Sequence, residues 1–380
     1  PTFALGHAAL ALLGHECGAP VARQARVESA RRHAPRGTER ERSHVHAVLR
    51  HLDGDPAPMI AHLRAHPRDA LLLSAAVPTI AFAGVTTVPA DAWAIVERCG
   101  TAYGDDWWYA GLLAFVRQEQ ARFEESFELA CRSLQEEPRA GHSVHARCHV
   151  HYETGDHGAG LSWLDGWITG GGQSADNLAH FSWHAALHEL SLDDVTAVRA
   201  RWDDQLAPPA VTGCRALVDS ASLLWRWSLT SGPEGLPDAV RVLEHVDGDD
   251  IDHPPSGFMA MHAAVAVCAA GDVDRLHRLD HWCRVQSDPV LSGVAAPLAA
   301  SLVQLGRGHG SVAADGLARL EQQIWRLGGS DAQREVVEDT RIAALLSAGR
   351  NAEARRLLDR RLDRRASPRD SLWREKSVSR

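Results

Sequence analysis

Lysine is almost missing from this chain. It occurs once, at Lys376, and arginine supplies every other positively charged side chain. A Schiff base with pyridoxal phosphate or with a carbonyl substrate needs a lysine amine, so neither is expected. A P-loop nucleotide site needs a Gly-Lys-Ser/Thr sequence and is not expected either. The Gly-x-Ser-x-Gly sequence does not occur, which argues against an ordinary serine hydrolase.

Paired cysteines, long apolar runs and excess positive charge are also lacking. The seven cysteines are scattered and form no Cys-x-x-Cys pair, a pattern typical of reduced thiols in a cytoplasmic protein. No apolar run approaches the ~20 residues that span a bilayer, so membrane association is not expected. The net charge of −9 does not favour nucleic acid as a partner, because a phosphate backbone attracts a basic surface.

Helical repeats organise what is present. Residues 121–138, ARFEESFELACRSLQEEP, have the pattern of the second helix of a tetratricopeptide repeat (TPR), with small Ser126, Ala130 and Ser133 on one face. Residues 107–120 supply the first helix, and the turn at residue 121 recurs 34 residues later. Strand-like patterns of period two are nearly absent.

We therefore predict an all-α fold, a TPR-like superhelix of about eight helical hairpins. It is expected to form a single α-solenoid over residues 1–365. Residues 366–380 are rich in arginine and are expected to form a basic C-terminal tail.

These segments resemble the tetratricopeptide repeat protein 38 family. The resemblance is carried, in chain order, by FALGHAALALL, DWWYAGLLAFVRQEQARFEESFELACRSL, SVHARCHVHYETGDHGAGLSWL, NLAHFSWHAALHELSLDD, DSASLLWRWSL and FMAMHAAVAVCAAGD. It implies an all-helical superhelix of such repeats. It does not imply an activity, because no catalytic assignment transfers residue by residue.

Histidines repeat with nearly the same period. Two His-x-x-x-His pairs, His145/His149 and His180/His184, lie 35 residues apart. Residues four apart share a helix face, and equivalent positions of adjacent repeats face one surface. The four rings are therefore expected to converge on one concave patch.

Other histidines either share this register or lie outside it. His44 and His262 precede their turns at a similar distance, so they are expected to border the same cavity. The pairs His62/His66 and His277/His281 are expected to face solvent and to need no function.

The first hypothesis is a pocket for a small polar metabolite, in which histidines act as acid, base or hydrogen-bonding groups. The reaction would be a hydrolase, lyase or isomerase step. Arg226 is the candidate for a substrate carboxylate. The candidate catalytic residues are His145, His149, His180, His184 and Glu153; the candidate binding residues are His44, Trp107, Trp108, Trp183, Asp219, Trp225, Arg226 and His262.

Two alternatives remain open. In one, the four paired histidines bind Zn²⁺ or another divalent metal, with a carboxylate as ligand or base. In the other, the concave groove is a non-catalytic scaffold that binds a peptide, a partner protein or a second copy of the chain. The predicted metal ligands of the first alternative are His145, His149, His180 and His184.

Overall fold

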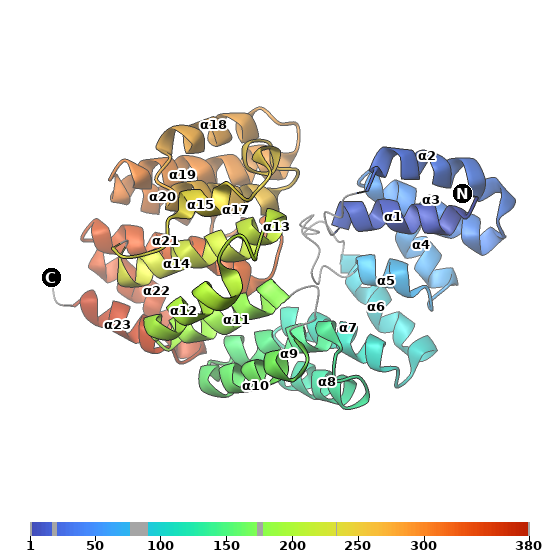
Figure 1. Ribbon diagram of the computed structural model, residues 1–380, viewed down its shortest axis with the longest axis horizontal. Coiled ribbons are helices and arrows are strands. Elements are labelled where there is room, and N and C mark those ends of the chain that lie inside the picture. The colour runs from blue at the N-terminus through green and yellow to red at the C-terminus, as the bar shows by residue number, and fades with distance from the viewer. Residues whose placement is uncertain (1, 17–20, 77–89, 173–177, 233, 379–380) are drawn as a thin grey trace. The chain divides into compact units, whose positions relative to one another are not determined.

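The computed structural model describes residues 2–16, 21–76, 90–172, 178–232 and 234–378. Within these ranges the regular elements are helices and no strand occurs, so the all-α prediction is confirmed (Figure 1). No helix in the described ranges combines the length and apolar character needed to cross a membrane.

The chain divides into two compact units, Pro1–Ala146 and Arg147–Arg380, and the boundary falls within helix α9. The two units are described separately below. The prediction of one continuous solenoid over residues 1–365 stays a prediction.

The first unit is built from paired helices around one hydrophobic core. Helices α1 and α2, α3 and α4, and α7 and α8 pack against each other. The helix bounds are α1 Ala4–Glu16, α2 Arg23–His33, α3 Glu39–Leu52, α4 Ala57–Ala65, α5 Ala70–Ala76, α6 Ala90–Tyr103, α7 Trp107–Glu119, α8 Phe123–Glu136 and α9 Gly141–Glu153, with a short 3₁₀ helix η1 at Ala34–Arg36.

The second unit begins with paired helices, and its described residues include three π-helical segments. Helices α10 and α11 pack together, and the π-helices η3 and η4 follow α12 and α13. The bounds are α10 His157–Gly170, α11 Leu178–Ser191, α12 Val195–Arg201, η3 Trp202–Leu206, α13 Gly213–Arg215, η4 Ala216–Ala221, α14 Ser222–Ser231, α15 Ala239–Leu243 and α16 Gly248–Asp252.

The remaining helices of this unit pack in chain order from α17 to α23 (Figure 1, yellow to red). Their bounds are α17 Gly257–Ala269, α18 Val273–Arg284, η5 Leu291–Ala295, α19 Ala296–Gly306, α20 Gly310–Leu320, η6 Ile324–Leu327, α21 Asp331–Ser347, α22 Asn351–Arg364 and α23 Pro368–Lys376. The element η5 is a π-helix and η6 a 3₁₀ helix.

The predicted helical pair over residues 107–138 is present as α7 and α8. Ser126, Ala130 and Ser133 are fully buried. The Ser126 hydroxyl donates to the carbonyl of Ala114, and the Ser133 hydroxyl donates to the carbonyl of Trp107, both at 2.7 Å. Small side chains thus let the two helices approach closely, as the repeat pattern predicts.

The end of the chain differs from the prediction. Residues 368–376 form helix α23, which packs on α22. Trp373 is 3% exposed within a hydrophobic cluster of α20, α21 and α22, and the Arg369 guanidinium lies 4.9 Å from its ring centre. The expectation of a tail from residue 366 was wrong, because this arginine-rich sequence also carries an apolar anchor.

Replacing Trp373 by alanine is therefore expected to destabilise the protein by about 3–5 kcal/mol, the cost typical of deleting a buried aromatic side chain. The neighbouring Leu372 is 39% exposed, so Leu372→Ala is the matched control and should change the free energy by no more than about 0.5 kcal/mol. Urea unfolding followed by circular dichroism measures both values. Equal, small effects would mean that the end of the chain is not packed as described.

Candidate functional site

Two histidines and one aspartate meet inside the first unit. His44 lies in α3, His62 lies in α4, and Asp69 directly precedes α5. The Oδ2 atom of Asp69 is 2.7 Å from Nδ1 of His44 and 3.0 Å from Nε2 of His62. Potential ligand atoms of the three buried residues all lie within 4.8 Å of one another. This arrangement can hold a metal ion.

The local sequence explains how these side chains are positioned. Thr38 and Glu41 form a capping box that starts α3, and His44 falls on the buried face of that helix. The Oδ1 atom of Asp69 accepts from the backbone N–H of Leu72 at 3.4 Å in the first turn of α5. The other carboxylate oxygen is left to face the two rings.

The charges around this group favour an ionised carboxylate. Burial by itself raises the pKa of Asp69, but hydrogen bonds from His44 and His62 outweigh it and hold that pKa well below its usual range. The Nδ1 atom of His62 lies 2.8 Å from the Ser43 hydroxyl. The Arg40 guanidinium, 3.7 Å from Asp69, is mostly exposed. Both rings and the carboxylate are therefore held in fixed orientations.

A cavity of about 200 Å³ borders this group, and His44, Asp69 and Arg40 form part of its wall. The remaining wall is mainly apolar. Its other residues are Phe3, Leu5, Gly6, Ala9, Glu41 and Leu71. A small ligand in this cavity would therefore be next to two of the three potential metal ligands.

Three of the four predicted patch histidines come together in the second unit. The ring centres of His149 and His184 are 4.7 Å apart, as are those of His180 and His184. The Nδ1 atom of His180 is 2.8 Å from Asp219, whose other oxygen is 3.2 Å from Arg215. The sequence register thus identified a real cluster, and Asp219 orients one of its rings.

His262 lies close enough to Asp219 and His180 for their charges to shift the pKa of its ring. It is completely buried, and within the described residues neither ring nitrogen has a hydrogen-bond partner. Burial, reinforced by Arg226 and opposed by Asp219, lowers the pKa of His262 to about 3. Burial likewise lowers the pKa of His149 to about 3. Both rings are neutral at physiological pH.

The predicted residues of the first unit are described by their contacts within that unit. The His145 ring stacks on Phe115 with 5.1 Å between ring centres. Trp107 and Trp108 begin α7, and Trp107 is 39% exposed. In the second unit Trp183 is fully buried and stacks on His180.

Arg226 is not available for a substrate carboxylate, contrary to the prediction. It is completely buried. Its guanidinium donates to Asp339 at 3.0 Å and to the carbonyls of Ala332 and Gln333 at 2.7 and 3.1 Å. Its partners are therefore groups of the protein itself.

Glu153 and Trp225 also have structural partners. The Glu153 carboxylate is buried and pairs with Arg365 at 3.3 Å; burial, opposed by Arg365, raises its pKa to about 6. The Trp225 indole N–H donates to the Thr340 hydroxyl at 2.8 Å. Both side chains join α9 or α14 to helices near the end of the chain, which sequence spacing does not reveal.

The sequence interpretation missed two members of the His44 group. His62 was assigned to solvent but is 1% exposed, and Asp69 was not selected. The available signal was the spacing of His62 and Asp69, which lie seven residues apart on either side of Pro67. The side chains of His277 and His281 are both exposed, so the expectation that this pair faces solvent is confirmed.

No family model matches the chain, and no solved structure matches it. The resemblance to the tetratricopeptide repeat protein 38 family stays a prediction.

The neutral buried histidines predict acid sensitivity. The pKa of a histidine in the unfolded chain is near its ordinary value of 6.5, whereas burial lowers the pKa of His262 to about 3 in the folded chain. Below pH 6.5 the unfolded chain therefore binds a proton that the folded chain excludes, and stability is lost as the pH falls towards 3. His262→Gln should reduce the loss between pH 6 and pH 5 by about 1 kcal/mol.

Denaturant unfolding at the two pH values measures this difference. The control is His281→Gln, an exposed histidine of α18, which should leave the pH dependence unchanged. An unchanged dependence in His262→Gln would show that this ring is protonated or solvated in the folded protein.

Proposed function

We propose that the protein binds a divalent transition metal through His44, His62 and Asp69 and uses it to act on a small polar ligand in the adjoining cavity. The observation that carries this proposal is the meeting of three buried ligand atoms at the wall of a cavity. It retains the metal-assisted small-molecule hypothesis suggested by the sequence but assigns it to other residues.

The donor set suits such a metal. Two imidazoles and one carboxylate are typical ligands of Zn²⁺ and non-haem Fe²⁺, and catalytic sites combine three protein ligands with a position left for water or substrate. Metal-bound histidines commonly use their second nitrogen to hydrogen-bond a neighbouring group. The contact of His62 with the Ser43 hydroxyl supplies that support. A metal would replace the protons now shared between Asp69 and the rings.

The cavity supports a ligand that is small and polar at one end. Its volume of about 200 Å³ is below that of drug-sized ligands. The mostly exposed Arg40 guanidinium can hold an anionic group through two hydrogen bonds. A metal-bound water beside this position would provide a nucleophile or base for hydrolase or lyase chemistry.

The His149, His180 and His184 cluster remains a candidate acid–base group, as the sequence suggested. Its support is the orientation of His180 by Asp219. The architecture that carries both groups is proposed to be that of the tetratricopeptide repeat protein 38 family, supported by the close α7 and α8 pairing.

Metal content decides between these assignments. Untagged protein purified without chelators should bind one equivalent of Zn²⁺ or Fe²⁺ by native mass spectrometry and elemental analysis. Asp69→Asn and His62→Gln should lose it, since each removes a ligand atom. His46→Gln changes an exposed histidine of the same helix as His44 and should keep the metal.

Each alternative result has a separate meaning. Metal that is lost in His184→Gln but kept in Asp69→Asn would move the site to the second unit. Protein that binds no added metal would contradict the proposal and favour the scaffold alternative. Circular dichroism of each variant verifies that the helices persist.

Ser43→Ala tests the support of His62 rather than the ligands themselves. Loss of such a hydrogen bond typically weakens metal affinity about 10–100-fold. The variant should still reach one equivalent at saturating metal, and competition with a chelator measures the affinity. Unchanged affinity would show that Ser43 does not position a metal-bound ring.

A further inference from the structure

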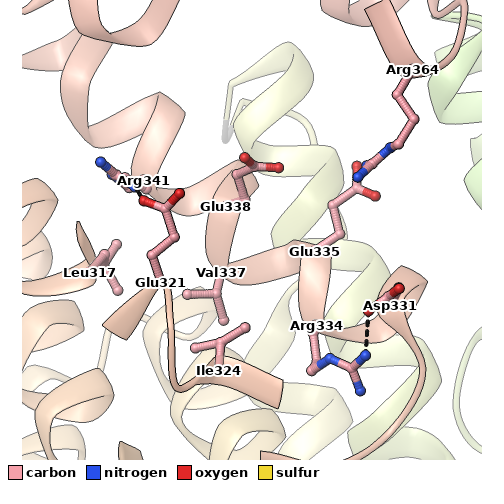
Figure 2. Close-up of a pocket in the computed structure, with 10 residues that line it drawn as sticks. All are labelled: Leu317, Glu321, Ile324, Asp331, Arg334, Glu335, Val337, Glu338, Arg341 and Arg364. Atoms are coloured by element: carbon pink, nitrogen blue, oxygen red, sulfur yellow. Dashed lines mark hydrogen bonds and ion pairs between the residues drawn. The ribbon is translucent and has the colours of Figure 1, made fainter. Parts of the chain in front are cut away.

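A second cavity, of about 240 Å³, lies in the second unit among α20, η6, α21 and α22. Figure 2 shows its lining side chains. Leu317, Ile324 and Val337 form an apolar part of the wall, and the other lining side chains are charged. Charges of both signs around an apolar surface favour a ligand that carries a positive group, a negative group and an apolar part.

Glu335 supplies a fixed negative charge at this cavity. It is 7% exposed, and its Oε1 atom accepts hydrogen bonds from Arg361 and Arg365. Within the described residues no hydrogen bond engages its Oε2 atom. The two guanidiniums outweigh burial and hold the pKa of Glu335 well below its usual range. The residue therefore presents an ionised carboxylate to the cavity.

Glu338 is the carboxylate with the weakest pairing in this wall. Its one ion pair within the described residues is with Arg361, at 3.9 Å. Burial raises the pKa of Glu338, the charges of Arg361 and Arg364 oppose this rise, and the nearby carboxylates of Glu335 and Asp339 add to it. A cationic group of a ligand would relieve this repulsion, because it would lie between two carboxylates.

The positive charges of the wall are only partly used. Arg364 is exposed and forms no hydrogen bond or ion pair in the part of the chain that the structure describes. Arg341 donates to Glu321 at 2.7 Å, but its buried Nε–H has no partner among the described residues. Figure 2 places Glu321 and Arg341 on one side of the pocket, Glu335 and Arg364 on the other, and Glu338 between them.

We propose that this cavity binds a small zwitterion with an aliphatic side chain, that is, an apolar amino acid or a short apolar peptide. The ammonium group lies between Glu335 and Glu338, the carboxylate faces the guanidinium of Arg364, and the side chain contacts Ile324 and Val337. This site is independent of the metal site proposed in the first unit.

Isothermal titration calorimetry with L-leucine tests the proposal on the full chain. Two analogues of leucine each keep one of its two charged groups. The compound 4-methylpentanoate lacks the ammonium group, and 3-methylbutylamine lacks the carboxylate. Leucine should bind at least about tenfold more tightly than either, because each analogue leaves one charged hydrogen-bonding group unmatched. Leucyl-leucine is tested in parallel. Tighter binding of leucine would identify the ligand class as a free amino acid, and tighter binding of leucyl-leucine would identify it as a peptide.

Two variants and two controls locate the binding. Glu338→Gln and Arg364→Gln should each weaken leucine binding about tenfold or more. Glu128→Gln and Arg319→Gln change exposed residues outside the cavity and should not alter it. Circular dichroism confirms that the variants are folded. The proposal is overturned if neither zwitterion binds, if the analogues bind as tightly, or if folded Glu338→Gln and Arg364→Gln bind leucine unchanged.

Discussion

A charged side chain that is buried among helices must find a partner of opposite charge or a hydrogen bond, because transfer from water is otherwise too costly. The second unit meets this constraint with a network of four buried arginines. Asp339 accepts from Arg226 at 3.0 Å, from Arg361 at 2.7 Å and from Arg369 at 3.2 Å, while Arg365 pairs with Glu335 and Glu153. These pairs connect α9, α14, α21 and α22, so helices far apart in sequence are held in one arrangement.

Both proposed sites lie where the same constraint leaves groups for a ligand. In the first unit, Asp69 accepts hydrogen bonds from the rings of His44 and His62 at a cavity wall, and a metal ion can take the place of the shared protons. In the second unit, arginines fix Glu335 through one oxygen, whereas Glu338 has one ion pair, at 3.9 Å, and Arg364 is exposed and forms no ion pair among the described residues. Pairing inside the unit thus creates the fixed charges, and incomplete pairing at the cavity makes them available.

The helices could be predicted from the sequence because their signals are local. The small residues Ser126, Ala130 and Ser133 indicated the face that packs on α7, and this prediction holds in detail. The repeat register also predicted correctly that His149 and His184 lie close together. The same reasoning misplaced Arg226, since its partners lie more than 100 residues away, and it overlooked Asp69, which lies just outside a helix. Contacts between distant segments leave no periodic pattern to detect.

The sequence by itself determined the helical class, the pairing of neighbouring helices and the clustering of histidines at a repeated register, because spacing along a helix decides which side chains share a face. Only the tertiary structure decided which polar residues are partners. His62 meets His44 and Asp69, Arg226 meets Asp339, and Trp373 anchors the last helix. These outcomes depend on burial, and burial of a side chain is a property of the packed helices rather than of its neighbours in the sequence.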